Sequence, residues 1–503
     1  MSKTGYIAFD LGAESGRAML LTLAGGSGGD SARFELHEAH RFANVPVRLP
    51  SGLHWNLTGL WAHLVEGLGR AGELAKQHGV ELASLGVDTW GVDFGLVSRS
   101  GHLLHLPLCY RDERFPGVCQ KTHDRHGASA IYDATGIQML PFNTLYQLLE
   151  MQEREPAVLQ AAGRMLNLPD LLHYFFSENM VNEATIASTT QMIDPHTGAW
   201  HKELLQKVGL PLEPLGEVVP AGTKIGSLRG ELVEAAEVQG IDVIVPGSHD
   251  TASAVAAVPV GPESGNWAFL SSGTWSLIGA ELDEPRVSEA TFNAGFTNER
   301  GVGGKIRFLK NISGLWLVQE TRRDYARAGT EMDYAELTDL AAQAEPFRTL
   351  VDPDHPPFGS PGDMRAKIDA FAKQTGQPAP EQPGQYVRCC LESLALCYAA
   401  TLRSAEAILG EPFDTLHVVG GGGKNRLLQQ MTADALNKPV VVGPEEGTAI
   451  GNALTQAMGR GDLADLAAIR DCVRRTVEPR TYQPEHADAF SAQRERYETL
   501  CGR

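Results

Sequence analysis

Asp250 is the residue of this chain whose setting best suits acid–base chemistry. It lies in the segment GSHDTAS at residues 247–253, which follows the apolar run IDVIVP and leads into a predicted helix. Because ligands of α/β sheets bind where strands end, a carboxylate here can serve as a general base toward a hydroxyl group. The structural alternative is that Ser248 or Asp250 only caps the helix. A helix N-terminus should keep Asp250 ionised and weakly basic, which phosphoryl transfer tolerates because the proton is accepted late.

A strand–turn–strand pattern occurs twice. Residues 7–22 read IAFDLGAESGRAMLLT, and residues 267–280 read WAFLSSGTWSLIGA. Each copy has apolar strands around a turn of glycine and small hydroxyl residues, where Ser15 and Thr274 add donors to the backbone N–H groups. One such hairpin is ordinary turn chemistry. Two copies, one opening each half of the chain, predict a duplicated fold that holds an anion such as phosphate from both sides.

Four glycines at residues 420–423 follow the apolar strand LHVV and precede a helix expected to start near Lys424. A merely flexible turn would be costly in entropy, so the pattern favours a backbone that passes close to a nucleoside. The segment is neither the GxxxxGK[ST] of a P-loop nor the GxGxxG of a dinucleotide-binding domain. A dehydrogenase is therefore disfavoured.

Several polar residues near these segments have two interpretations each. Asp10 ends the first strand, where it either caps the turn or contacts a metal-bound water. Glu14 would repel phosphate unless it points away or touches such a water, and Arg17 could offset its charge. Trp90 lies between Asp88 and Asp93, and core packing is favoured over a role as a sugar platform. Arg111 and Asp112 form either a salt-bridged turn or a sugar contact, and we leave them out of the site.

The elements that must position these residues read as α/β layers with a mixed sheet, because short apolar runs alternate with helical patterns. Leu60, Leu64 and Leu68 share one face of a helix expected at residues 57–78. We expect a hairpin loop at GGSGGD (25–30) and a helical stretch at 311–327. Residues 352–385 are dense in proline and glycine and predict a long surface excursion.

Composition limits the class of protein. The chain has 503 residues, too many for one core, with 43 Lys+Arg against 62 Asp+Glu and a net charge of −19. This balance disfavours nucleic acid and anionic membranes as partners. The N-terminus lacks the apolar region of a signal peptide, and no apolar run approaches the ~20 residues that span a bilayer. None of the seven cysteines is in a CxxC pair, so they indicate neither a zinc site nor a redox motif, and the expected location is cytoplasmic.

Taken together, these segments resemble the FGGY carbohydrate kinases, and among them the L-rhamnulose kinases most. The hairpins and GGGG are shared in kind with hexokinase and actin, whereas DTWGVDF, PFNTLYQL and KNI-GLW are more specific. The resemblance runs from about residue 5 to residue 460 and rests on the following segments in this order: IAFDLGAESGR, VDTWGVDF, LPFNTLYQL, GSHDTASAV, FLSSGTWSLIG, LKNISGLWLVQE, LHVVGGGGKN and GPEEGTAIGNAL.

The resemblance implies two duplicated α/β domains of the actin- and hexokinase-like (ribonuclease H-like) type, with a cleft between them. The N-terminal domain, residues 1–246, would hold the sugar side and the first phosphate loop. The C-terminal domain, residues 247–480, would hold the catalytic aspartate, the second phosphate loop and the adenosine loop. Residues 481–503 would form a peripheral tail.

It also implies a site. Asp250 matches the catalytic base, and ATP and Mg²⁺ are the implied cofactors, with Asp10 a tentative metal contact through water. The sugar contacts would be Gly91, His249, Asp250, Thr251 and Asn311. The ATP contacts would be Ala13, Glu14, Ser15, Gly16, Arg17, Thr274, Gln319 and Gly421.

The implied activity is ATP-dependent phosphorylation of the 1-hydroxyl of L-rhamnulose, giving the 1-phosphate and ADP in L-rhamnose catabolism. A different ketose, such as L-fuculose or L-xylulose, is the first alternative. A non-catalytic sugar or nucleotide sensor is the second, which the intact Asp250 disfavours. The expected partners are the sugar and ATP alone, and the chain is expected to be a monomer or a homodimer.

Overall fold

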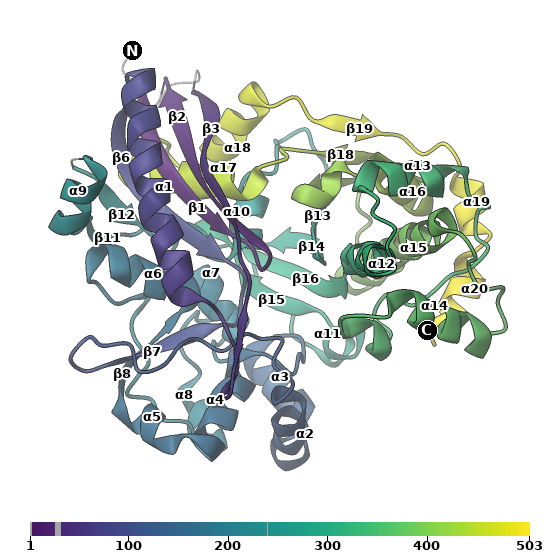
Figure 1. Cartoon of the computed structure of the whole chain (residues 1–503), viewed down its shortest axis with the longest axis horizontal. Helices are drawn as coiled ribbons and strands as arrows, with labels where there is room; N and C mark the ends of the chain where they lie inside the picture. Colours follow the sequence, from purple (N-terminus) through teal and green to yellow (C-terminus); the bar gives the residue numbers. More distant parts are fainter. Residues whose placement is uncertain (1–2, 26–31, 239, 503) are drawn as a thin grey trace. The chain divides into compact units, whose positions relative to one another are not determined.

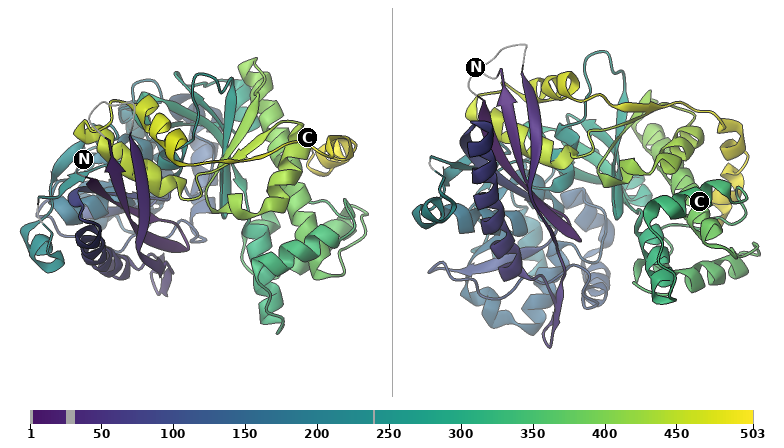
Figure 2. Two further views of the ribbon diagram at one scale, coloured as in Figure 1. Left: turned by 90° about the horizontal axis from the view of Figure 1, so that it is seen from above. Right: turned by 45° about the horizontal axis from the view of Figure 1, so that its top comes forward.

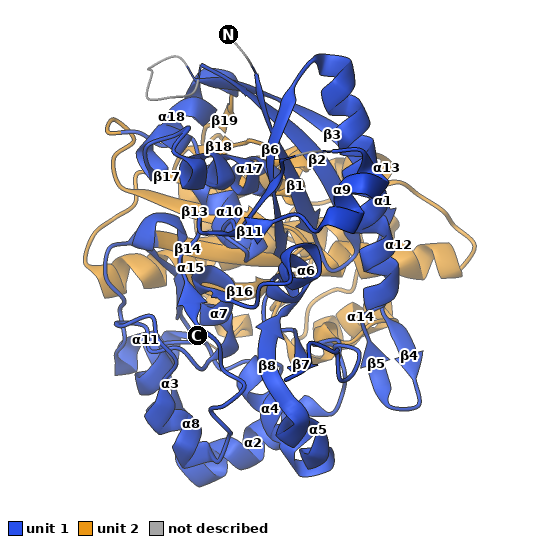
Figure 3. Cartoon of the chain, turned by 90° about the vertical axis from the view of Figure 1, so that its left-hand side faces the viewer, with its two compact units in different colours: residues 1–261, 281–308, 447–477 blue, residues 262–280, 309–446, 478–503 orange. Residues whose placement is uncertain are grey.

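The computed structural model describes residues 3–25, 32–238 and 240–502, so the loop predicted at residues 25–30 lies outside them except for Gly25. The chain forms two compact units from interleaved segments (Figure 3). Unit 1 comprises Met1–Gly261, Glu281–Phe308 and Gly447–Val477. Unit 2 comprises Pro262–Ala280, Leu309–Glu446 and Glu478–Arg503. Both combine helices with sheets, which confirms the α/β class.

Unit 1 is built on a six-stranded mixed sheet of order β11-β12-β6-β1-β2-β3. The first predicted hairpin is confirmed, because β1 pairs antiparallel with β2 and places Asp10 opposite Arg17. On its other side β1 runs parallel to β6, which places Asp10 opposite Asp88. The strands are β1 (Thr4–Leu11), β2 (Ser15–Ala24), β3 (Arg33–Ala43), β6 (Glu81–Thr89), β11 (Lys224–Ser227) and β12 (Asp242–Ile244).

Helices cover both faces of this sheet (Figures 1 and 2). On one face lies α1, which spans Leu57–His78 as predicted, with the side chain of Asn56 capping its start and Gly79 ending it at φ +63°. On the other face α17 (Gly447–Arg460) packs against β1 and β6. Its Gln456 Nε2 donates to the carbonyl oxygen of Ile7 at 3.0 Å, so a segment late in the chain covers one face of the first sheet.

None of the helices of the described residues combines the length and apolar character needed to cross a membrane.

The remaining elements of unit 1 are helices and short strands. They are β4 (Val47–Leu49), β5 (Gly52–His54), β7 (Phe94–Ser98), α2 (Phe115–His126), α3 (Ala128–Thr135), α4 (Thr144–Arg154), α5 (Pro156–Ala161), β8 (Ala162–Asn167), α6 (Leu168–Ser177), β9 (Asn182–Glu183), α7 (Ala184–Ala187), η1 (Ser188–Thr190), α8 (Lys202–Val208), β10 (Val218–Val219), α9 (Gly230–Ala236), α10 (Asp250–Ala256), α11 (Glu289–Ala294), β15 (Thr297–Arg300), η2 (Val302–Gly304) and α18 (Leu466–Thr476).

The second sheet has seven strands in the order β15-β16-β14-β13-β17-β18-β19. The second predicted hairpin is confirmed as the antiparallel pair of β13 and β14. Parallel pairing of β13 with β17 sets Ser271 beside Val419, so the turns that follow both strands lie at the same edge. The strands β13 (Trp267–Ser272), β14 (Trp275–Leu282), β16 (Ile306–Ser313), β17 (Thr415–Val419), β18 (Val440–Val442) and β19 (Arg480–Tyr482) accompany the helices α12 (Trp316–Arg327), α13 (Tyr334–Gln343), η3 (Pro356–Gly359), α14 (Met364–Gln374), α15 (Pro383–Leu409), η4 (Gly421–Lys424), α16 (Arg426–Leu436), α19 (Ala487–Ser491) and α20 (Arg494–Leu500).

Two expectations about this part of the chain were wrong. Residues 311–313 end strand β16, which lies between β15 and β14 in the sheet, so the helix begins only at Trp316. The N–H groups of Gly314 and Leu315 donate to the carbonyl oxygens of Thr274 and Gly273 at 3.1 and 2.9 Å. Residues 352–385 are not a mere surface excursion, since they contain α14. Met364, Ile368 and Phe371 recur at spacings of four and three, which gives α14 one buried face.

Candidate active site

Asp250 is the first residue of α10, and a short network fixes the loop before it. His249 forms a parallel bridge with Thr89 at the end of β6. The backbone N–H of Ser248 donates to Glu183 Oε2 at 3.1 Å, and that of His249 donates to Thr185 Oγ1 at 3.1 Å. The helix cap is His249, without a side-chain capping bond, so neither Ser248 nor Asp250 serves as the cap.

The carboxylate of Asp250 is accessible and basic. Its side chain is 31% exposed. Its Oδ1 accepts hydrogen bonds from the backbone N–H of Thr251 at 2.5 Å and from Thr251 Oγ1 at 3.1 Å. Burial raises the pKa of Asp250, the charge of Asp10 acts in the same direction, and His249 opposes both. The lowering expected from a helix N-terminus was wrong in direction, because burial is the largest influence on this carboxyl group.

Behind His249 lies a buried ion-pair network. Arg307 is fully buried on β16, and its NH2 lies 3.0 Å from both Glu299 Oε2 and His249 Nδ1. His249 Nδ1 is 3.2 Å from Glu299 Oε2, while His249 Nε2 faces Asp250 Oδ1 at 3.4 Å. Burial alone would raise the pKa of Glu299, but Arg307 and His249 hold it below its usual value. The network therefore fixes the ring of His249 against the proposed base.

Three carboxylates of unit 1 influence one another. Asp10 accepts from Arg17 Nε at 2.9 Å and from Arg17 NH2 at 2.6 Å. Asp88 is fully buried; its Oδ2 accepts from Asn452 Nδ2 at 2.6 Å, while its Oδ1 has no hydrogen-bond partner among the residues that the structure describes. Burial, then the charges of Asp10 and Asp250, raise the pKa of Asp88 well above its usual value. Mg²⁺ prefers hard oxygen donors, and the carboxylate of Asp10 and the unpartnered Oδ1 of Asp88 are of this kind, so these residues fit that ion.

Gly91, the proposed sugar contact, lies in a rigid turn after β6. A Cβ at Gly91 would lie 3.1 Å from Thr189, which leaves no room for a side chain. Val92 adopts φ +69°, a left-handed conformation that costs a β-branched residue about 1–3 kcal/mol. Its N–H donates to Thr189 Oγ1 at 3.0 Å, and its carbonyl accepts from Thr144 Oγ1 at 2.5 Å. These bonds hold the strained turn in place.

Asp93 anchors the same turn from within the core. Its Oδ2 accepts from the indole N–H of Trp55 at 2.6 Å and of Trp90 at 2.8 Å, and its Oδ1 accepts from Gln147 Nε2 at 3.0 Å. Burial raises the pKa of Asp93 to about 6, although these hydrogen bonds lower it. Trp90 is 7% exposed and its ring lies 4.1 Å from that of Trp55, so it packs in the core as favoured.

Two smaller groups of unit 1 were also singled out. Asp112 pairs with the guanidinium of Arg114 at 2.8 Å, so the arginine of this ion pair is a different one from Arg111, which the sequence suggested. The segment predicted to contact phosphate, Ala13 to Arg17, covers the end of the β1–β2 turn and the first residues of β2, and the turn is closed by the bond from the N–H of Gly12 to the carbonyl of Ser15 at 2.8 Å. Within it Ser15 is exposed, whereas Gly16 is buried against Phe42.

In unit 2 the structure brings together three of the proposed ATP contacts. Thr274 lies in the turn after β13, and its Oγ1 accepts from Gln319 Nε2 at 3.2 Å. Gly421 opens η4 directly after β17, at the same sheet edge. A Cβ on the next residue, Gly422, would lie 2.1 Å from Ser272 Oγ, so the glycine turn packs directly on β13. Asn311, the fourth proposed residue of unit 2, lies near the end of β16.

Sequence reasoning missed Glu183, Glu299 and Arg307. Each lies more than 40 residues from Asp250 in the sequence, and their partners become known only from the fold. One signal was available for Arg307, which interrupts the apolar strand segment IRFL, since a charge between apolar residues is a candidate for a buried ion pair.

Family models match both halves of the chain. The N-terminal domain model of the FGGY family of carbohydrate kinases matches residues 5–257, and the C-terminal domain model matches residues 268–460. The chain is 42% identical to the rhamnulokinase of Bacteroides thetaiotaomicron over 490 residues, which cover 97% of this chain and 98% of that protein. It is 38% identical to the rhamnulokinase of Enterococcus faecalis over 507 residues, covering 100% of this chain and 98% of that protein.

Solved structures share the fold. The xylulose kinase from Lactobacillus acidophilus superposes with a TM-score of 0.78 at 16% identity, covering 99% of this chain and 97% of that one. The glycerol kinase from Plasmodium falciparum, solved with ADP, gives 0.76 at 16% identity, covering 100% and 97%. At this identity the likeness concerns the fold alone.

Proposed function

Because the chain belongs to the FGGY family of carbohydrate kinases, we propose that it transfers the terminal phosphoryl group of ATP to the 1-hydroxyl of L-rhamnulose. The choice of sugar is supported by the rhamnulokinases that match nearly the whole chain. The product pair is L-rhamnulose 1-phosphate and ADP, in the catabolism of L-rhamnose.

The observation that carries the reaction type is the accessible carboxylate of Asp250 with its raised pKa. Asp250 accepts the proton of the 1-hydroxyl as the oxygen–phosphorus bond forms and the bond to the β-phosphate oxygen breaks. A raised pKa makes this carboxylate a better proton acceptor than an ordinary aspartate at neutral pH. Thr251 donates to Oδ1, so the other oxygen faces the hydroxyl.

The other residues bind and orient. The sugar contacts are His249, which Glu299 and Arg307 hold, the turn at Gly91, and Asn311. The phosphates of ATP are bound by Ala13, Glu14, Ser15, Gly16 and Arg17, and the nucleotide also by Thr274, Gln319 and Gly421. When bound, Mg²⁺ would neutralise phosphate charge, and Asp10 and Asp88 are the residues that would hold it, directly or through water.

The experiment compares ADP release with L-rhamnulose, L-fuculose and L-xylulose for the wild type and for Asp250→Asn. We expect L-rhamnulose to give the highest kcat/KM, and Asp250→Asn to lower kcat about 10²–10⁴-fold while sugar binding persists. A preference for another ketose would refute the substrate, and near-wild-type turnover of Asp250→Asn would refute the base. Binding of ATP and sugar by the wild type without ADP release would favour a sensor instead.

A further inference from the structure

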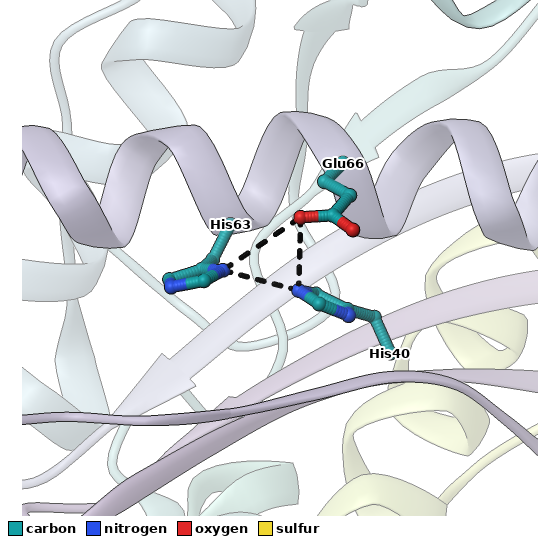
Figure 4. Close-up of side chains that lie close together, drawn as sticks. All are labelled: His40, His63 and Glu66. Atoms are coloured by element: carbon teal, nitrogen blue, oxygen red, sulfur yellow. Dashed lines mark hydrogen bonds and ion pairs between the residues drawn. The ribbon is translucent and has the colours of Figure 1, made fainter.

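Three side chains of unit 1, away from Asp250, converge on one point (Figure 4). His40 comes from β3, whereas His63 and Glu66 come from successive turns of α1. His40 Nε2 lies 3.1 Å from His63 Nδ1 and 3.4 Å from Glu66 Oε2, and His63 Nδ1 lies 3.9 Å from the same oxygen. One ligand-type atom of each residue therefore points at the other two.

These distances are those of a tetrahedral metal site. Zinc binds imidazole nitrogen and carboxylate oxygen at about 2.0–2.2 Å, so neighbouring ligand atoms around it are about 3.3–3.5 Å apart. The three separations bracket this value. Hydrogen bonding explains them less well, because a single proton on His40 Nε2 can serve only one of its two neighbours, and the lone pairs of His63 Nδ1 and Glu66 Oε2 would still face each other.

We propose that His40, His63 and Glu66 bind a divalent transition-metal ion of the zinc class. Two imidazoles and one carboxylate suit Zn²⁺ and also Co²⁺, Ni²⁺ and Cu²⁺, whereas Mg²⁺ prefers oxygen ligands. His63 and Glu66 keep 40% and 44% of their side-chain exposure, which leaves a fourth position open to water or a small ligand. Because the ligands come from two elements, the ion would clip α1 to β3.

The surroundings hold the three ligands in the required orientation. Arg70 NH2 donates to Glu66 Oε1 at 2.5 Å, which turns Oε2 toward the two rings. The ring of Phe42 stacks on His63 with centroids 4.4 Å apart and lies 5.4 Å from His40. The guanidinium of Arg70 adds some repulsion to a cation at this point. That arginine is half exposed, so solvent screens this charge.

The test titrates chelator-stripped full-length protein with Zn²⁺ at neutral pH, in competition with a chromogenic zinc chelator. Four proteins are compared: the wild type, His63→Ala, Glu66→Gln, and His102→Ala as a control at an exposed histidine outside the cluster. We expect the wild type to bind Zn²⁺ with a micromolar or lower Kd. Each ligand variant should raise that Kd at least about 10-fold, and His102→Ala should leave it unchanged.

Two further measurements, of Tm and of competition by Mg²⁺, complete the test. His63 and Glu66 are exposed, so both variants should match the wild type in Tm when no metal is present, and only the wild type and His102→Ala should gain Tm on adding Zn²⁺. Excess Mg²⁺ should not displace the Zn²⁺. Equal Zn²⁺ affinity in the wild type and His63→Ala, or displacement by Mg²⁺, would overturn the site.

Discussion

The buried pair of Glu299 and Arg307 gives the sharpest test of how the site is held. Glu299→Gln leaves the fully buried guanidinium of Arg307 without its partner at 3.0 Å. An arginine does not lose its proton in a protein, so the charge stays, and breaking a buried pair in this way costs about 3–5 kcal/mol. Arg307→Met should lose less stability, because the unpaired Glu299 can take up a proton and become neutral.

The free energy needed to protonate Glu299 follows from the usual pKa of a glutamate, 4.5. Protonating such a group at pH 7 costs about 3.4 kcal/mol, at about 1.36 kcal/mol per pH unit, and this is the upper limit for the charge penalty of Arg307→Met. Protonation of His249, 3.2 Å from Glu299, lowers it further. The double variant Glu299→Gln/Arg307→Met buries no unpaired charge and should lose less stability than Glu299→Gln alone.

The assay is urea unfolding of the three variants and the wild type between pH 6 and pH 8. The loss of unfolding free energy in Glu299→Gln should not change with pH. The loss in Arg307→Met should grow as the pH rises, because protonating the unpaired Glu299 becomes more costly. The folded-state pKa of Glu299 is below its unfolded value, so the stability it contributes to the wild type is present above pH 4.5 and is lost as the pH falls below it. Additive penalties in the double variant would refute the coupling.

Three other predictions concern the two units. Gly421→Ala should keep the wild-type Tm and raise the KM for ATP, since a Cβ there would meet no atom of the described residues within 4 Å. Gly422→Ala should lower Tm, because its Cβ would collide with Ser272. Equal Tm values for the two variants would contradict this packing. Trp90→Phe removes a donor to Asp93 and should cost about 1.5–3 kcal/mol at pH 8 but less at pH 5. The pKa of Asp93, about 6, lies above its usual 3.8, so its ionisation destabilises the fold as the pH rises through this range, and a pH-independent change in Tm would argue against the anchor. Asp88→Asn should raise Tm by relieving buried charge and should raise the Mg²⁺ concentration needed for half-maximal activity; unchanged Mg²⁺ dependence would remove Asp88 from the metal site.

Features of the fold that depend on local pattern could be predicted from the sequence. The leucine spacing of α1 and the apolar runs on both sides of the two glycine turns predicted these elements, because both patterns are properties of the segment itself. α14 was missed because the prolines and glycines around it outweighed the spacing of its buried residues in a reading based on composition.

The site could be predicted only in part, for a related reason. Asp250 was recognisable from the strand before it and the helix after it. The direction of its pKa was not, because burial, which raises it most, is set by the fold, and the added charge of Asp10 comes from a residue 240 positions away in the sequence. Likewise, nothing next to His249 in the sequence indicates that Arg307 and Glu299 hold its ring.

The return of α17 to the first sheet has a consequence for the order of events during synthesis. Unit 1 needs Gly447–Val477, yet most of unit 2, residues 309–446, leaves the ribosome before that segment. At about 5–20 residues per second this delay is roughly 7–28 s. Throughout it, Tyr6, Ala8 and Ala83 lack the apolar side chains of α17 that later bury them. The nascent chain therefore carries an uncovered apolar sheet face throughout this delay, which is the kind of surface that chaperones bind.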